Sequence, residues 1–170
     1  LYDQEESAQR TSGAPPFDSR RFLAILEFSG PARLAALERD LTLDIARSAG
    51  AVEADNRLYL DWLQHRYVSY STPWYARDYF NDTIEVTARW SALPQMYAAM
   101  RESIAAIAPG AHFGVHWSHF YPEGACQYMT LRLPPMPDER ALAQMRRAWD
   151  AIVRECHRQV QEDVLKALRE

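Results

Sequence analysis

The stretch HFGVHWSHFYPEGACQYMTLRL, residues 112–133, predicts two antiparallel strands joined by a tight turn. Within Tyr121–Gly124, proline holds the second position and glycine the fourth, which are the positions that these residues favour in turns. The strands are expected over His112–Tyr121 and Ala125–Leu133. A hairpin of this length indicates an antiparallel sheet at the centre of the fold.

The pairing within this hairpin follows from the position of its tip. With Pro122 and Glu123 as a two-residue tip, His119 opposes Cys126 and Trp117 opposes Tyr128, and opposed residues share a face. One predicted face therefore holds Val115, Trp117, His119, Cys126, Tyr128, Thr130 and Arg132. Its mixed polar and aromatic character is typical of a ligand surface. The other face carries Met129, Leu131 and Leu133 and is expected to meet the helices.

The segments on either side of the hairpin predict further strands, and helices that return onto this sheet. A buried strand is expected over Phe22–Phe28 and another over Thr83–Ala88, which is rich in β-branched residues. Helices are expected after Pro31, after Ser91 and after Asp138. The apolar stripe of the first is Leu34, Leu37, Leu41 and Ile45, and that of the second is Met96, Met100, Ile104 and Ile107. This order predicts an α+β fold, a ferredoxin-like antiparallel sheet with helices packed on one face.

The last helical pattern runs without a break from Asp138 to Glu170. A helix of this length is uncommon in a compact domain. The segment is therefore either one long helix, or two helices between which a loop near residues 155–158 is absent from the sequence.

Composition limits the class of protein. The 170 residues suit one domain, and the formal net charge of −4 argues against a nucleic-acid binder. Cys126 and Cys156 form no metal-ligand pattern, so a reduced, cytoplasmic setting is expected. No apolar run reaches the length of a membrane span, and no signal peptide is visible. The acidic start at Leu1, without methionine, suggests a domain of a larger protein.

The segment Leu58–Phe80 is unusually rich in aromatic residues, and Thr11–Ser19 has the composition of a loop. The rings of the aromatic segment either pack on the core or form the wall of an apolar ligand site.

Tyr128 is the most informative residue of the hairpin. A tyrosine acts as a general acid or base when a neighbouring cation or hydrogen-bond donor lowers its pKa, and the predicted pairing places His119 diagonal to it. Alternatively, Tyr128 and His119 are a structural pair on a half-buried sheet. His112, His116 and His119 have helical spacing but lie on a strand, where His119 faces away from the other two, so no metal site is expected.

Ser118–Pro134, SHFYPEGACQYMTLRLP, resembles the C-terminal cap region of FAD-linked oxidases of the vanillyl-alcohol-oxidase superfamily. Within that superfamily it is similar to the alkyldihydroxyacetonephosphate (alkylglycerone-phosphate) synthases. The shared motif is Tyr-x-x-Gly-Ala-Cys-x-Tyr, matched by Tyr121, Gly124, Ala125, Cys126 and Tyr128. Weaker matches follow in the family's order at LYDQEES (1–7), LEFSGP (26–31), HRY (65–67), ARD (76–78) and DTIEVTARW (82–90), so the resemblance covers nearly the whole chain.

The resemblance implies a transferase of ether lipid biosynthesis that exchanges the acyl chain of acyl-dihydroxyacetone phosphate for a fatty alcohol, with FAD as cofactor. Tyr128 matches the family's catalytic tyrosine, with His119 as its partner. Arg77 resembles the arginine that binds substrate, and Thr83 stands where the family has a small hydroxyl residue in the site. Trp117, placed opposite Tyr128 by the predicted pairing, is a further expected substrate contact.

Two departures from the family pattern are present. The stretch between Arg77 and Asp82 is shorter than in the family, and the family's histidine-rich segment near Glu155–His157 is absent. Both departures fit missing loops, and both also fit a divergent protein that has lost the activity.

The expected partners follow from the resemblance. Residues 1–170 are predicted to form the substrate-binding cap, with FAD held mainly by an FAD-binding domain of the same polypeptide that is not present in this chain. A lipid-like phosphate is the expected substrate, in a cytoplasmic, bacterial protein. A homodimer and peripheral membrane association stay open. The alternatives are an FAD-dependent oxidoreductase (an oxidase or dehydrogenase) of another alcohol or hydroxy acid, and a non-catalytic ferredoxin-like binding module.

Overall fold

The computed structural model describes residues 1–10, 21–68 and 71–169. The predicted loop at Thr11–Ser19 and the aromatic residue Tyr70 lie outside these residues. The elements in chain order are α1 (Gln4–Arg10), α2 (Ala32–Ser48), α3 (Arg57–His65), α4 (Thr72–Tyr75), β1 (Phe80–Arg89), α5 (Leu93–Ile107), β2 (His112–Ser118), β3 (Gly124–Leu133) and α6 (Asp138–Ala167).

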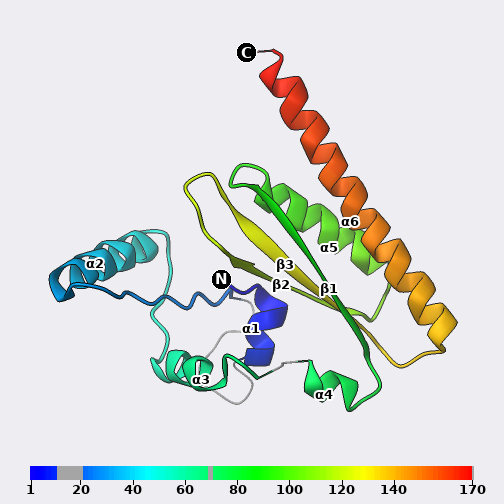
Figure 1. Cartoon of the computed structure of the whole chain (residues 1–170), viewed down its shortest axis with the longest axis horizontal. Coiled ribbons are helices and arrows are strands. Elements are labelled where there is room, and N and C mark those ends of the chain that lie inside the picture. The colour runs from blue at the N-terminus through cyan, green and yellow to red at the C-terminus, as the bar shows by residue number, and fades with distance from the viewer. Residues whose placement is uncertain (11–20, 69–70, 170) are drawn as a thin grey trace.

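The sheet is antiparallel and its strands run in the order β1-β3-β2 (Figure 1). Strand β3 is therefore paired on both sides, with Ile84 of β1 and Val115 of β2 both opposite Met129. Successive side chains of a strand point to opposite faces, so these two registers fix the two faces of the whole sheet. The predicted α+β class is confirmed.

Helices α5 and α6 pack together on one face of the sheet and enclose the core (Figure 1). From α5, Met96, Met100 and Ile104 are at most 2% exposed, as the predicted stripe requires. They meet Met129, Leu131 and Leu133 of β3, which are fully buried. From β2 the core receives Phe113, Val115 and Trp117, and from α6 it receives Ala141, Ala148 and Ile152.

The N-terminal segment extends the sheet beyond β2 by one short bridge. Tyr2 pairs with His116 on one side and with Leu23 on the other. The prediction of a buried strand over Phe22–Phe28 is wrong, because only Leu23 finds a partner among the described residues. Phe22 and Leu26 are 43% and 45% exposed.

A buried ion pair ties α1 to the face of the sheet opposite α5 and α6. Arg132 donates from Nη1 to Glu6 at 2.8 Å, and the two side chains are 2% and 4% exposed. Gly114 makes this approach possible, because a Cβ atom there would lie 2.5 Å from Glu6 Oε1. Asp3, also buried, accepts from the backbone N–H of Glu6 and from the hydroxyl of Tyr97 on α5. The N-terminal segment thus links both faces of the sheet.

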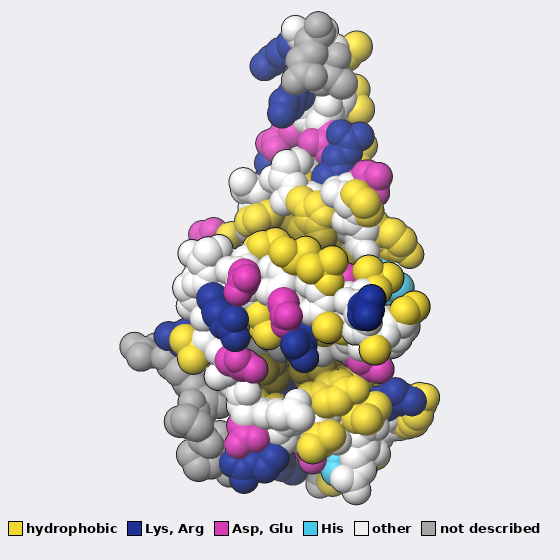
Figure 2. Space-filling view, turned by 90° about the vertical axis from the view of Figure 1, so that its left-hand side faces the viewer, with side chains coloured by type: hydrophobic (Ala, Val, Ile, Leu, Met, Phe, Trp, Pro, Cys, Tyr) yellow, Lys and Arg dark blue, Asp and Glu magenta, His cyan; other side chains and the backbone are white. Residues whose placement is uncertain are grey.

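Helix α2 forms over the predicted residues but stands apart from the sheet (Figure 1). Its stripe, Leu34, Leu37, Leu41 and Ile45, is 50–70% exposed, so nothing among the described residues covers it. Figure 2 looks onto this side of the molecule and shows hydrophobic side chains in bands between charged ones.

Helix α6 is a continuous helix of 30 residues over the predicted helical segment. Ile152 is fully buried, whereas Val160, Val164 and Leu168 are 53–79% exposed because this end projects past the sheet (Figure 1). Neither α6 nor any other helix in the described part of the chain combines the length and the apolar character that crossing a membrane requires.

The glycine of the hairpin motif is required by a close backbone approach. A Cβ atom on Gly124 would lie 2.0 Å from the carbonyl oxygen of Ala88 on β1. Gly124→Ala should therefore lower the free energy of unfolding by about 2–3 kcal/mol, since strand β1 must shift. Urea denaturation measures this loss. Gly50→Ala, where φ is +84° but no atom lies within 4 Å, should cost about 1 kcal/mol from backbone strain alone. Equal losses would contradict the steric explanation.

The Arg132–Glu6 pair provides a second test of the fold. Glu6→Gln removes the charge that compensates a buried guanidinium, so the free energy of unfolding should fall by about 3 kcal/mol. The matched control is Glu53→Gln, whose ion pair with Arg47 has side chains 66% and 55% exposed and should contribute less than about 1 kcal/mol. Similar losses in the two variants would show that burial does not govern this pair.

Candidate active site

The face of the sheet opposite α5 and α6 is polar, and three chemically active side chains form a row across it. Glu85 of β1 and His116 of β2 both lie directly opposite Tyr128 of the central strand. Tyr128 and His116 are half-buried and Glu85 is exposed. We call this surface the polar face. Its members are Asn81, Thr83, Glu85 and Thr87 of β1, Cys126, Tyr128, Thr130 and Arg132 of β3, and His112, Gly114, His116 and Ser118 of β2.

The predicted pairing of the hairpin is wrong by one residue. Ser118, rather than His119, opposes Cys126, and His116, rather than Trp117, opposes Tyr128. The connection is a five-residue loop over residues 119–123 instead of a two-residue tip. A slip of one residue moves every side chain of a strand to the other face. The predicted faces are therefore correct for β3 and reversed for β2.

The cause of the longer loop is a contact from outside the hairpin. Trp90, just after β1, donates from Nε1 to the carbonyl oxygen of Tyr121 and from its backbone N–H to that of Glu123. His119 adopts φ +50° and leaves the ladder at that point. The turn chemistry of Pro122 and Gly124 carries no information about this distant tryptophan.

Trp117 and His119 are consequently not beside Tyr128. Trp117 lies in the core, where its Nε1 donates to Gln127 at 3.0 Å. His119 is exposed at the end of β2, with Nδ1 3.0 Å from the hydroxyl oxygen of Ser118. The predicted diagonal contact between His119 and Tyr128 is therefore replaced by a direct one from His116.

His116 is the residue that the sequence reasoning missed. Its ring centroid lies 4.7 Å from that of Tyr128 and 5.5 Å from that of Tyr2. Burial, and next the positive charge of Arg10, lower the pKa of His116 to about 4, so the ring is neutral at physiological pH. A usable signal was present in the sequence, because Phe113, Val115 and Trp117 alternate and would naturally face the helices together with Met129.

Cys126 lies beside this row, in contact with Glu85. The Cys126 thiol donates to the Glu85 carboxylate at 3.8 Å. Burial, and next the charge of Glu85, raise the pKa of Cys126, so the thiol stays protonated. Cys126 is therefore a hydrogen-bond donor here and no nucleophile.

Thr83 lies on the polar face, opposite Thr130 and one pair along β1 from Glu85. Its side chain is exposed, as are those of Glu85 and Thr87. The structure thus places two predicted site residues, Thr83 and Tyr128, on the same face.

Arg77 follows α4, at the end of the polar face closed by aromatic rings. Its guanidinium lies 4.5 Å from the ring centroid of Trp74, and its Nε donates to the carbonyl oxygen of Pro73. Trp74 in turn packs on His112 of β2, with ring centroids 4.6 Å apart. Here the aromatic segment packs on the sheet and carries an exposed arginine.

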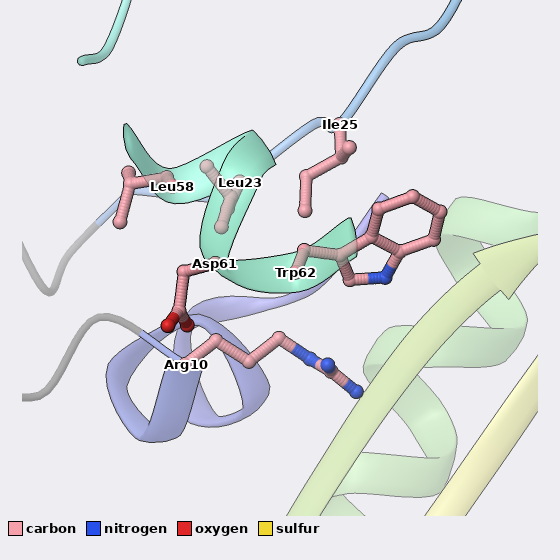
Figure 3. Close-up of a pocket in the computed structure, with 6 residues that line it drawn as sticks. All are labelled: Arg10, Leu23, Ile25, Leu58, Asp61 and Trp62. Atoms are coloured by element: carbon pink, nitrogen blue, oxygen red, sulfur yellow. The ribbon is translucent and has the colours of Figure 1, made fainter. Parts of the chain in front are cut away.

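A small pocket lies away from this row, between α1, the segment at residues 23–25 and α3. Figure 3 shows apolar side chains on its upper wall and a carboxylate and a guanidinium below. The lining residues are Arg10, Leu23, Ile25, Leu58, Asp61 and Trp62. Its walls offer no nucleophile or histidine.

The polar face carries the groups with which a ligand could form hydrogen bonds. It offers exposed hydrogen-bonding side chains at Thr83, Glu85 and Thr87 beside Tyr128. Among the described residues, no three or more His, Cys, Asp or Glu side chains gather in a way that would hold a metal ion. The glycines of the described part form no glycine-rich segment of the kind that cradles a dinucleotide phosphate.

Comparison with known proteins gives a consistent picture. Residues 3–158 match the family described as FAD linked oxidases, C-terminal domain. No curated protein matches the chain. Two crystal structures of alkyldihydroxyacetonephosphate synthase are similar, with TM-scores of 0.61 and 0.58 and identities of 18% and 19%. Each alignment covers 91% of this chain but only 33% and 32% of the synthase, so the chain spans about a third of their length.

The low pKa of His116 makes stability depend on pH. Between pH 6.5 and about 4 the unfolded chain binds a proton at this residue and the folded protein does not, so stability falls as pH falls through this window. His116→Phe removes this contribution. Between pH 7 and pH 4 the variant should lose about 2 kcal/mol less unfolding free energy than the parent, after a discount for partial exposure. Urea denaturation at both pH values measures this, and identical pH dependence would contradict it.

Proposed function

Because this chain belongs to the FAD linked oxidase C-terminal domain family, we propose that it is the substrate-binding cap of an FAD-dependent enzyme. The polar face is then one wall of the active site. The observation that carries this proposal is the row of Glu85, Tyr128 and His116 on a part of the polar face that is partly exposed, while the opposite face is sealed by α5 and α6.

Tyr128 is the proposed acid/base residue. It stands on the central strand, so neighbouring strands hold it on both sides, and its hydroxyl group can exchange a proton with a bound substrate. The imidazole of His116 and the carboxylate of Glu85 are the side chains directly opposite it. They replace His119 in the role of partner to Tyr128.

Arg77 and Thr83 are the proposed substrate contacts. The guanidinium of Arg77 is held over Trp74 and Tyr79, at 4.5 and 5.5 Å from their ring centroids, and is suited to a phosphate group. Thr83 offers a hydroxyl group on the same face as Tyr128. Trp117 has no place in this site, because it lies on the other face.

FAD, when bound, would supply the electron-accepting ring, and its phosphates would be held by an FAD-binding domain of the same polypeptide. Thr83, Glu85 and Tyr128 are the side chains of this chain that would meet the ring.

The proposed reaction is the one that the resemblance to the alkyldihydroxyacetonephosphate synthases implies: exchange of the acyl chain of a dihydroxyacetone phosphate ester for a fatty alcohol. The substrate would then be a lipid-like phosphate, in agreement with an arginine beside aromatic rings. The family name favours a second candidate, a true oxidase or dehydrogenase of another alcohol or hydroxy acid. Bleaching of the flavin by substrate without oxygen, with electrons passed to an acceptor, distinguishes the second from the first. A homodimer, peripheral membrane association and a cytoplasmic location stay predictions.

The decisive variant is Tyr128→Phe in the full-length flavoprotein. Turnover of acyl-dihydroxyacetone phosphate with a fatty alcohol should fall about 10²–10⁴-fold, because the proton can no longer be moved, while the flavin absorbance is unchanged. Tyr67→Phe, at a side chain 88% exposed, is the control and should keep full turnover. Full turnover in Tyr128→Phe would remove this tyrosine from the mechanism.

A further inference from the structure

We propose that His116 is a positioning residue for Tyr128, whose ring it holds in one orientation on the polar face. This inference rests on the proposed function, in which Tyr128 moves a proton. It assigns to His116 a role through Tyr128 and no contact with the reacting atoms.

The geometry behind the proposal is a series of ring contacts that crosses the edge of the sheet. The guanidinium of Arg10 lies 4.0 Å from the ring centroid of Tyr2. Tyr2 lies 5.5 Å from His116 at an interplanar angle of 40°, and His116 lies 4.7 Å from Tyr128 at 30°. Each contact brings together groups from a different segment: α1, the N-terminal bridge, β2 and β3.

Tyr2, at the outer end of this series of ring contacts, is held by backbone hydrogen bonds. The backbone N–H of Tyr2 donates to the carbonyl oxygen of Leu23 at 2.8 Å, and the N–H of Leu23 donates back at 3.1 Å. The neighbouring Asp3 N–H donates to Val115 of β2 at 2.8 Å, beside His116. Tyr2 is therefore held in place beside the imidazole of His116. The imidazole in turn limits the positions that the Tyr128 ring can take.

Positioning matters because Tyr128 lies on an open face. Among the described side chains, the ring of His116 is the one aromatic group in contact with that of Tyr128, at a tilt of 30°. On the β1 side it faces Glu85, a flexible and exposed side chain. A general acid or base must lie within hydrogen-bond reach of its proton, and small errors of placement cost much of the rate.

The charge of His116 agrees with this role. Burial comes first among the causes that lower its pKa to about 4, followed by Arg10 of α1, the amino group of Leu1 and His119 of the hairpin loop. The imidazole is therefore neutral at physiological pH. It therefore offers Tyr128 an uncharged ring contact, and its protonation should not appear in a pH–rate profile above pH 5.

The experiment compares His116→Ala and His116→Phe in the full-length flavoprotein. His116→Ala removes the ring, so kcat should fall about 10–100-fold with KM for the acyl substrate and the flavin absorbance unchanged. His116→Phe restores a flat ring without nitrogen atoms and should keep kcat within about threefold, with the pH–rate profile of the parent. In a Tyr128→Phe background, His116→Ala should cause no further loss.

A readout independent of turnover follows the ring itself. With fluorotyrosine incorporated, the ¹⁹F resonance of residue 128, assigned by its absence in Tyr128→Phe, should broaden or shift in His116→Ala and stay close to the parent in His116→Phe. Thermal unfolding of each variant separates misfolding from misplacement, and His116→Phe keeps the test decisive if His116→Ala fails to fold.

Three results would overturn the proposal: full turnover in His116→Ala, a His116→Phe variant as slow as His116→Ala, or an unchanged ¹⁹F resonance in His116→Ala. The slow His116→Phe variant would mean that the imidazole nitrogens, and not the ring, are needed. If Tyr128→Phe keeps full turnover, the proposed function fails, and the ¹⁹F resonance alone then decides whether His116 orders the ring.

Discussion

Strand β3 is hydrogen-bonded on both sides, and this double pairing constrains every other part of the structure. With Met129 opposite Ile84 on one side and Val115 on the other, odd-numbered residues of β3 face α5 and α6 and even-numbered residues face away. A shift of either neighbour by one residue would bury polar side chains and expose apolar ones, which the hydrophobic effect strongly disfavours. The close approach of Gly124 to the Ala88 carbonyl shows how tightly this register is set at the hairpin end. The row of Glu85, Tyr128 and His116 is a direct consequence of that register.

The N-terminal segment connects this register to the candidate site. Asp3 caps α1 and reaches Tyr97 on α5, while Glu6 reaches Arg132 on the opposite face. Burial raises the pKa of Asp3, although four hydrogen-bond and charge partners act in the other direction. Keeping this carboxylate ionised inside the folded protein therefore costs free energy. The same segment places Tyr2 against His116. A network that secures α1 on the sheet therefore also sets one boundary of the polar face.

Much of this architecture could be predicted from local patterns, and the exceptions have one physical cause. The stripe Met96, Met100 and Ile104, the two faces of β3 and the extent of α2 follow from periodicity and were predicted correctly. The hairpin register and the segment at 22–28 both depend on partners far away in the sequence. Trp90 contacts the hairpin loop and lengthens it. In the segment at 22–28, Leu23 alone pairs with Tyr2. Turn chemistry describes four adjacent residues and cannot include such contacts. The sequence therefore predicted the face of β3 on which Tyr128 lies, but it placed Trp117 and His119 beside this residue instead of His116 and Glu85.

The exposed side chains of β1 on the polar face affect how this chain could act on a substrate. Proton transfer to a bound substrate is most effective where water is excluded, yet Thr83, Glu85 and Thr87 are exposed while the other face is closed by two helices. In the proposed function the polar face is one wall of an active site, and a second wall comes from outside the described residues. In the proposed function that wall is the flavin and the domain that binds it, which would also bring the substrate against Tyr128. The ring contacts of His116 with Tyr2 and Tyr128 then serve the proposed positioning role, because a half-buried residue must keep its orientation before the second wall closes over it.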